Sequence, residues 1–355
     1  MTATEGMARD YDAHSEYQRA VADTGAARIR SCVEAVTLGV GDTFVVADYG
    51  CSTGANSMVA VHTAVAAVRT RNSAQPVVAI HNDLPSNDWN QLFANVESSP
   101  NSYLRVPGPS AIPLASAISF FAPSAPARSV HLGMSFSAAH WLRTQPTVAV
   151  PGGFYFCDAT GDARAALAAE ADADWTTFLT ARAADLATGG RLLAQMVGTD
   201  GQGNVTARKS LRAMAAVAAE MAADGKLDPK AVEQYILPAY ARTVDEARAP
   251  LTRPGSPVHG VLAEVECRTD PVPNPYLAKW RSDGDAEAYG TAYAAFLRGF
   301  TESSLRDHLF APGVPAGDLD GAVDDFFARL AARFAADPER EPFEDWTLTV
   351  VLTRT

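Results

Sequence analysis

An acidic residue and two glycines stand close together after an apolar run near the start of the chain. Asp48 follows residues 44–47 (Phe-Val-Val-Ala), and Gly50 and Gly54 come next, before a stretch with helical spacing. Glycines at a strand-to-helix turn let the backbone approach a ligand at the carboxyl edge of a parallel sheet. The segment 48–56 therefore predicts a nucleotide-type site.

The spacing of these glycines excludes two common phosphate sites. It matches neither G-x-G-x-x-G, the dinucleotide fingerprint, nor G-x-x-x-x-G-K-[ST], the phosphate loop with its lysine. The anionic Asp48 also suits a cationic ligand better than a pyrophosphate. S-adenosylmethionine (SAM), which carries a sulfonium and an ammonium, is a ligand of that kind.

A second acidic residue, Asp83, lies at the end of the next predicted strand, which begins with residues 77–80. Its carboxylate could accept both hydroxyls of a ribose while Leu84 packs against the adenine, because an acidic residue after the second strand is the usual ribose contact in such folds. Either aspartate alone could instead be a helix-capping or turn residue. Taken together, at successive strand ends, they favour a ligand site.

The composition points to a globular protein that acts on small molecules. The chain has 355 residues, 47% of them hydrophobic, enough for one large domain or two closely packed ones. Its net charge of -12 repels phosphate backbones, so we expect no nucleic-acid partner. Residues 1–17 lack the apolar core of a secretory signal, and no run is long enough to span a membrane. We therefore expect a cytoplasmic protein without a membrane partner.

Cysteine and histidine spacing predicts no metal site. The four cysteines have no C-x-x-C spacing, which argues against both a zinc site and a disulfide framework. The histidines form no ligand constellation either.

Apolar runs alternate with helical stretches in the first half of the chain, which is a βαβ pattern. Further strands are expected at 129–132, 191–197, 260–266 and 346–352. Helices are expected at 173–186, 211–221, 229–235 and 285–298, and Pro-rich loops at 107–126 and 250–257. Gly189-Gly190 is expected to stop the helix at 173–186, so that Arg191 begins a strand.

Several motifs, in order along the chain, share one resemblance. The segment 48–56 is similar to D-x-G-C-S-x-G-x-N, and residues 82–90 are close to N-D-L-P-x-N-D-F-N. Residues 119–121 resemble S-F-Y, and residues 140–142 match H-W-L. All four segments look like motifs of the plant-type SABATH methyltransferases. These enzymes methylate carboxylates such as salicylate, benzoate and jasmonate, or ring nitrogens of xanthines.

The resemblance covers almost the whole chain. Residues 11–18 look like the family's N-terminal element, and residues 178–191 resemble F-L-x-x-R-x-x-E-L-x-x-G-G-R, with Asp185 in the glutamate's place. Residues 236–246 resemble an element of the family's cap. Chance agreement at all these places is negligible, and the chain is identified as a bacterial-type member.

This resemblance implies a fold and a division of the chain. The fold is a Rossmann-like α/β core, a mostly parallel seven-stranded sheet with helices on both faces, plus an α-helical cap. Residues 1–205 would form an N-terminal lid segment and the SAM-binding core. Residues 206–310 would form the cap, with a strand near 260–266 returning to the sheet, and residues 311–355 a helix and strand that complete the core. The family also suggests a homodimer.

The resemblance implies site residues as well. SAM would be held by Tyr11, Ser15, Asp48, Gly50, Asn56, Asp83, Leu84, Ser119, Phe120, Ser135 and Phe136. Gln18 and Trp141 would hold the acceptor carboxylate, and Ser137, His140, Leu211, Leu297 and Phe300 would line its pocket. Ser137 falls where the family has an aromatic residue, and Leu211 where a salicylate-type relative has tryptophan.

Methyl transfer from a sulfonium to a carboxylate is an in-line displacement by a nucleophile that is already ionised at neutral pH, so it needs no general base. Gln18 and Trp141 can donate N–H groups that orient the carboxylate. His140 could line the pocket or act as a base for a less acidic nucleophile.

Three functions follow for testing. The first is O-methylation of a small, largely apolar carboxylic acid, a salicylate- or benzoate-like acid before an isoprenoid or fatty acid. The second is N-methylation of a purine-like heterocycle. The third is a SAM-binding partner subunit that has lost activity.

Overall fold

The computed structural model describes residues 16–39 and 41–355, with side chains from residue 25 onward. Its centre is a seven-stranded sheet in the order β3-β2-β1-β4-β5-β7-β6. The strands are β1 (Phe44–Tyr49), β2 (Val77–Asp83), β3 (Ile112–Ala117), β4 (Val130–Phe136), β5 (Leu186–Val197), β6 (Leu262–Val272) and β7 (Asp345–Arg354). Strands β1 to β5 are parallel, and β7 runs antiparallel to both β5 and β6. The predicted mostly parallel α/β sheet is confirmed.

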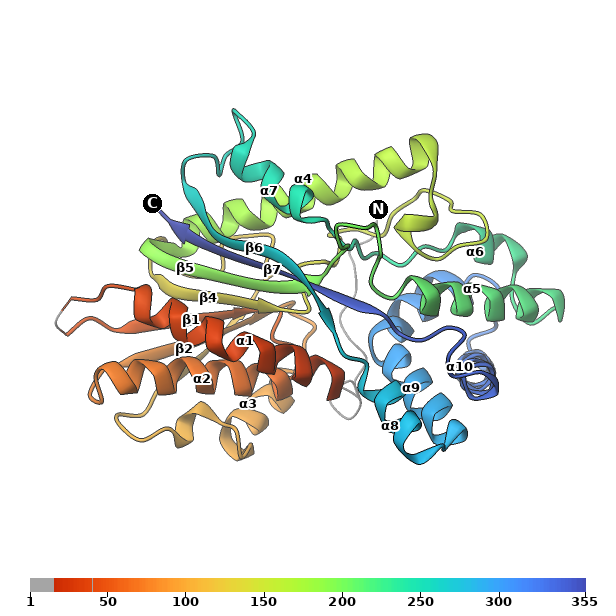
Figure 1. The fold of residues 1–355 in the computed structure, drawn as a ribbon, viewed down its shortest axis with the longest axis horizontal. Coiled ribbons are helices and arrows are strands. Elements are labelled where there is room, and N and C mark those ends of the chain that lie inside the picture. The colour runs from red at the N-terminus through yellow and green to blue at the C-terminus, as the bar shows by residue number, and fades with distance from the viewer. Residues whose placement is uncertain (1–15, 40) are drawn as a thin grey trace.

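Each face of the sheet is buried under helices, because alternate residues of a strand point to opposite faces. On one face, Val46 and Met134 pack with helices α1 (Glu16–Ala35) and α2 (Ala55–Arg71). On the other face, Ala47 and Leu192 pack with α4 (Gly161–Asp185) and α7 (Val244–Thr252). Figure 1 shows the two helical layers on opposite sides of the sheet.

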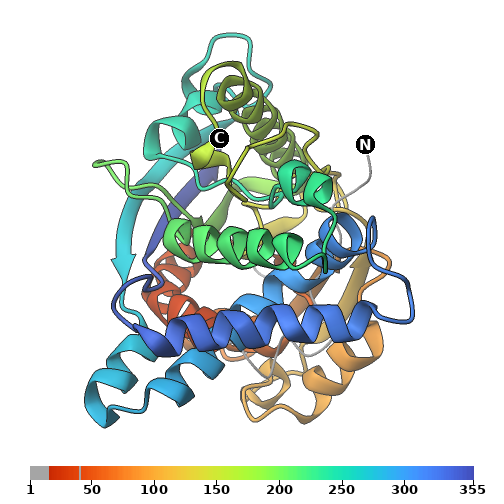
Figure 2. The ribbon, with the colours of Figure 1, turned by 90° about the vertical axis from the view of Figure 1, so that its right-hand side faces the viewer.

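A second, helical core lies beyond the carboxyl ends of the parallel strands, at the right in Figure 1. Its helices are α5 (Arg208–Ala223), α6 (Pro229–Gln234), α8 (Pro275–Asp283), α9 (Ala286–Leu305) and α10 (Leu319–Ala336). Figure 2 shows α5 and α10 crossing in front of the sheet. This arrangement confirms the predicted helical cap. The remaining helical segments are α3 (Trp89–Ser98), η2 (Tyr103–Arg105), η3 (Phe156–Asp158) and η4 (Arg306–Phe310).

The C-terminal part of the chain serves both cores. Strand β7 lies between β5 and β6 in the sheet, whereas Phe326 and Leu330 of α10 are buried in the cap. The division at residues 205 and 310 stays a prediction.

Three expectations about elements were wrong. Strand β3 forms inside the Pro-rich segment 107–126, where a loop was expected, because an edge strand tolerates Pro113. Helix α4 ends at Asp185, one residue before the expected end at 186, but the glycine pair does not stop it: β5 begins at Leu186, not at Arg191, and runs through Gly189-Gly190. The register between β4 and β5 shifts there, and a Cβ on Gly190 would lie 2.8 Å from the carbonyl oxygen of Val130, so the glycine pair forms a bulge.

A fourth expectation was wrong in part. Helix α7 continues through Pro250, the first residue of the predicted loop 250–257, and ends at Thr252. Proline has no N–H, so the helix lacks the hydrogen bond that residue 250 would donate to the carbonyl oxygen of residue 246, and it ends two residues later.

Gly290 provides a test of the cap packing. A Cβ at this residue of α9 would contact the carbonyl oxygen of Ala331 and lie 2.9 Å from the Cβ of Ala335, both in α10. We expect Gly290→Ala to lower the free energy of unfolding by about 1–3 kcal/mol, because the two helices must separate. Gly321→Ala in exposed space is the matched control, and chemical denaturation of both variants is the measurement. Equal stabilities of the two variants would contradict the close packing.

Candidate active site

The carboxyl ends of β1 and β2 lie side by side and are joined by the turn that follows β1. Asp48 pairs in register with His81, and Tyr49 with Asn82. The backbone N–H groups of Gly50 and Cys51 both donate to the carbonyl oxygen of Asn82, at 2.9 and 3.1 Å. The glycine turn is therefore fixed on the end of the second strand.

Two glycines make this turn possible. Gly50 has φ +85° and Gly54 has φ +90°, in the left-handed region that disfavours side chains. A Cβ on Gly50 would collide with the Cβ of Ala138, and a Cβ on Gly54 would lie 2.6 Å from Cδ1 of Leu92. Both glycines are therefore required by the turn and by the packing around it, and the approach of a ligand to this backbone stays a prediction.

Asp48 is an unusual carboxyl group because it is only 3% exposed. Burial raises its pKa to about 6, a hydrogen bond from Ser57 opposes the rise, and the charge of Asp83 adds to it. A buried carboxylate of this kind is stabilised by a cation. The site therefore suits a positively charged ligand group.

Asp83 holds the turn with both carboxylate oxygens. Its Oδ2 accepts the backbone N–H of Ser52 and its Oδ1 that of Leu84, each at 2.7 Å. Burial raises the pKa of Asp83, and these two hydrogen bonds oppose the rise. Each oxygen keeps a second lone pair, so the carboxylate can still accept ligand hydroxyls.

Asn56 carries a buried oxygen that has no hydrogen-bond partner among the described residues. Its Oδ1 is buried in the first turn of α2, at the end of the glycine turn. A buried polar atom without a partner is costly, which fits a ligand donor at this place.

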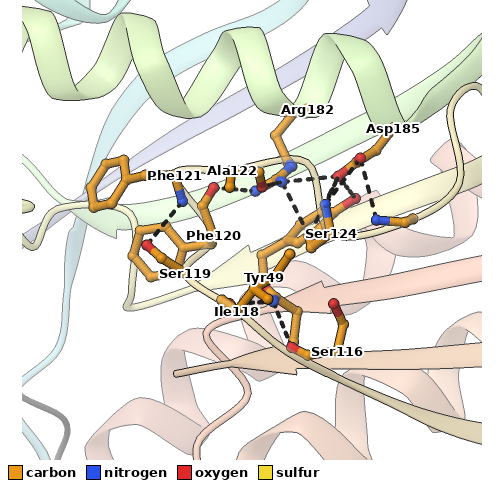
Figure 3. A network of polar contacts seen from close by, with 12 residues as sticks. Tyr49, Ser116, Ile118, Ser119, Phe120, Phe121, Ala122, Ser124, Arg182 and Asp185 are labelled. Atoms are coloured by element: carbon orange, nitrogen blue, oxygen red, sulfur yellow. Dashed lines mark hydrogen bonds and ion pairs between the residues drawn. The ribbon is translucent and has the colours of Figure 1, made fainter. Parts of the chain in front are cut away.

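Phe120 reaches the same turn from the loop after the third strand, where Ser119 precedes it. Asn82 Nδ2 donates to the carbonyl oxygens of Ser116 and Ile118, both at 2.8 Å, and so ties the end of β3 to β2. Cε1 of Phe120 lies 3.6 Å from the place where Gly50 would carry a Cβ. Figure 3 shows Ser119 and Phe120 on the loop after β3.

Ser135 and Phe136, at the end of β4, pack inward. The Ser135 hydroxyl donates to the carbonyl oxygen of Tyr49 at 2.9 Å, and Ser135 is fully buried. Phe136 packs with the α1 and α2 side of the sheet, where its Cε1 lies 2.9 Å from the Cβ position of Gly25. Ser137 follows with φ +51°, and its N–H donates to the carbonyl oxygen of Gln195 at 2.8 Å.

His140 and Trp141 sit where core and cap meet. Trp141 forms an antiparallel bridge with Ala239. The N–H of Leu142 donates to the carbonyl oxygen of Pro238 at 2.8 Å, and the N–H of Tyr240 to that of His140 at 3.0 Å. Backbone hydrogen bonds thus hold residues 140–142 against the cap segment 238–240.

Both side chains carry a buried nitrogen without a partner in the described part of the chain. These atoms are Nδ1 of His140 and Nε1 of Trp141. Burial, with a smaller contribution from the charge of Arg242, lowers the pKa of His140 to about 3. His140 is therefore neutral at physiological pH and is a weak base.

The apolar residues predicted to line the acceptor pocket belong to the helical core of the cap. Leu211 of α5 and Leu297 of α9 are fully buried in it, and Trp141 and Phe300 pack against it. The structure therefore brings these four predicted residues into one apolar cluster. Tyr11 and Ser15 lie outside the described residues, as does the side chain of Gln18, whose backbone is part of α1.

Arg242 is a residue that the sequence analysis missed. It is 2% exposed, and its guanidinium donates to the carbonyl oxygens of Ala139, just before His140, and of Ala171, at 3.2 and 2.8 Å. A basic residue that ends the apolar run 236–241 is the signal that could have indicated a buried role.

In the part of the chain that the structure describes, residues 16–39 and 41–355, no group of three or more His, Cys, Asp or Glu side chains is arranged to hold a metal ion. None of its helices is long and apolar enough to cross a membrane.

Comparisons with known proteins agree with this geometry. The family model described as SAM dependent carboxyl methyltransferase matches residues 1–355. The chain is 26% identical to "O-methyltransferase acrG" of Aspergillus aculeatus, over 88% of this chain and 84% of that protein. It is 27% identical to the jasmonate O-methyltransferase of Arabidopsis thaliana, over 59% of this chain and 62% of that protein.

A solved structure has the same fold. The loganic acid methyltransferase with S-adenosylhomocysteine (SAH) superimposes with a TM-score of 0.76 at 21% identity, over 100% of this chain and 99% of that chain. A bacterial origin stays a prediction. The match over the full length shows that this chain belongs to the SABATH family of SAM-dependent carboxyl methyltransferases, with SAM as its cofactor.

Proposed function

We propose that this enzyme transfers the methyl group of SAM to the carboxylate of a small, largely apolar acid. The observation that carries the proposal is the buried Nε1 of Trp141, a donor without a partner in the described chain, beside the neutral His140. An acceptor carboxylate would supply the missing hydrogen-bond acceptor.

The residues around the glycine turn fit SAM. Asp48 would face its cationic amino-acid part, Asp83 its ribose hydroxyls, and Asn56 would accept from a polar group through its free Oδ1. Leu84 and Phe120 would cover the adenine. Gly50 would present its backbone to the cofactor, and Tyr11, Ser15, Ser119, Ser135 and Phe136 would complete the proposed set. When bound, SAM supplies a methyl group activated by a sulfonium.

The protein then has to orient the acceptor and exclude water. A carboxylate is already ionised at neutral pH, so no residue must remove a proton. The Trp141 N–H and the Gln18 amide would hold its oxygens and fix one lone pair toward the methyl group. Leu211, Leu297 and Phe300 would enclose the rest of the acid, with Ser137 beside it.

The proposed acceptor class follows from the apolar side chains of Leu211, Leu297 and Phe300. Apolar side chains suit a salicylate- or benzoate-like acid first and an isoprenoid or fatty acid second. Relatives named for jasmonate, gibberellic acid and farnesoic acid support testing the second group with equal care. We further propose that the enzyme is a cytoplasmic homodimer, as the family resemblance suggests.

N-methylation of a purine-like heterocycle is less well supported. A ring N–H must lose a proton, and a histidine whose pKa is lowered to about 3 is a poor base for that step. An inactive SAM-binding subunit is the remaining alternative, and the buried Trp141 donor, which has no partner among the described residues, argues against it.

A product assay tests the proposal directly. Purified enzyme with SAM and a mixed pool of aromatic, isoprenoid, fatty-acid and purine acceptors should yield a methyl ester that is one methylene unit heavier than its acid. Mass spectrometry identifies the product. A methylated purine would support the N-methyltransferase instead, and SAH binding without any product would support the inactive subunit.

Trp141→Phe separates acceptor binding from cofactor binding. We expect the KM for the acid to rise by about tenfold or more, because a charge-assisted hydrogen bond is lost. The Kd for SAH should stay within about twofold, as it should in the control Trp280→Phe, which changes a tryptophan of α8. An unchanged KM would rule out the proposed contact.

The pKa of Asp48 predicts a pH dependence of cofactor affinity. Only the ionised carboxylate attracts a cation, so we expect SAM affinity, measured by calorimetry without acceptor, to fall as pH falls through about 6. The ligand-free enzyme should behave oppositely. Its raised carboxyl pKa contributes stability at low pH that is lost as pH rises through about 6.

Asp48→Asn is the control for this dependence. It should bind SAM more weakly at pH 7.5 and lose the step near pH 6. A wild-type affinity that is constant from pH 5 to pH 8 would contradict the role of Asp48.

A further inference from the structure

The loop that carries Ser119 and Phe120 has an unusual set of backbone partners. Residues 118–125, here called the cofactor loop, lead from β3 toward β4 and include Pro123, which has no N–H. Backbone polar groups that leave water need partners. In this loop several partners are charged side chains from the end of α4 (Figure 3).

Arg182 binds the carbonyl side of the loop. Its Nη1 donates to the carbonyl oxygen of Phe120 at 2.6 Å, and its Nη2 to that of Ala122 at 2.9 Å. Nη2 also lies 3.2 Å from the hydroxyl of Ser124 and 2.9 Å from Oδ2 of Asp185. One guanidinium thus contacts three successive parts of the loop.

Asp185 binds the N–H side of the same loop. Its carboxylate accepts the backbone N–H of Ser124 at 3.2 and 3.3 Å and that of Ala125 at 3.4 Å. It also accepts the Tyr49 hydroxyl at 3.3 Å. Donors and acceptors of the loop are therefore matched by opposite charges on one helical turn.

Tyr49 connects this pair to the glycine turn. The Arg182 guanidinium lies 3.8 Å from the centre of the Tyr49 ring, and Tyr49 directly follows Asp48. The start of the loop is held by Asn82, which directly precedes Asp83. Neighbours of both proposed cofactor carboxylates thus hold the loop that carries Phe120.

Stability alone does not explain the pair. Arg182 and Asp185 are both fully buried, and replacing a buried ion pair by apolar residues of similar volume is often neutral or stabilising. What apolar residues cannot do is fix the direction of a loop backbone. A positional role accounts for the cost of burying both charges.

We propose that Arg182 and Asp185 are positioning residues that set the cofactor loop, and through Phe120 the affinity for SAM. This inference rests on the proposed contact between Phe120 and the cofactor. Neither residue needs to touch SAM.

The test uses Arg182→Met. Asp185→Asn and Ser124→Ala are milder variants, because they change the side-chain volume little. For Arg182→Met we expect the Kd for SAH, measured by calorimetry, to rise by about tenfold or more. The KM for SAM should rise while the acceptor KM at saturating SAM changes little. Asp185→Glu, which keeps the carboxylate, should restore most of the affinity that Asp185→Asn loses.

Arg69→Met is the matched control. Arg69 is another buried arginine, in the last turn of α2 and so at the opposite end of that helix from the glycine turn, and it binds the carbonyl oxygens of Gln75 and Pro109. Arg69→Met should lose thermal stability, as Arg182→Met does, but should keep the wild-type Kd for SAH. If both variants lower stability and neither changes the Kd, the pair is only structural and the proposal is overturned.

Two further measurements separate this inference from the proposed function. Backbone hydrogen exchange of residues 116–126 in ligand-free protein should be faster in Arg182→Met than in Arg69→Met. Equal exchange rates would refute the claim that Arg182 holds the cofactor loop. Phe120→Ala should weaken SAH binding, and Arg182→Met should add little in that background. If Phe120→Ala binds SAH like the wild type, the proposed cofactor contact fails, and the inference that rests on it is overturned even where exchange is faster.

Discussion

The tight turn at Gly50 is the constraint on which the rest of the site depends. Its N–H is bound to the end of β2, and the space where a side chain would lie is filled by Ala138 after β4. Three strand ends therefore meet at one residue. The register of β1 and β2 brings Asp48 and Asp83 close enough for the charge of Asp83 to act on the Asp48 carboxyl group. Burial then gives the Asp48 carboxyl its raised pKa.

The sequence predicted this part well because it is encoded locally. Apolar runs marked β1 and β2, the glycines marked the turn, and Asp83 marked the end of the second strand. Buried parallel strands have a strong composition signal, and the turn needs residues that few other structures need. Leu211, Leu297 and Phe300 were located only through resemblance, since nothing in their spacing indicates that they share one apolar cluster with Trp141.

Other features could not be predicted because they depend on contacts distant in sequence. Strand β3 is an edge strand in which no residue is buried, so its sequence lacks the alternation of buried and exposed residues that marks a strand. Its pairing with β2 decides its conformation. The bulge at Gly189-Gly190 exists only because β4 lies beside it. The buried roles of Arg182 and Arg242 follow from carbonyl groups that lie 60 or more residues away. The neutral state of His140 likewise follows from its burial in the tertiary structure.

The bridge between Trp141 and Ala239 has a consequence for how this enzyme can change over evolutionary time. Core and cap are joined there by main-chain hydrogen bonds, which do not depend on the identity of the side chains around them. Substitutions on α5 and α9 can therefore reshape the proposed acceptor wall while the tryptophan keeps its place. A library that varies Leu211, Leu297 and Phe300 together is a natural starting point for directing the enzyme to new acids.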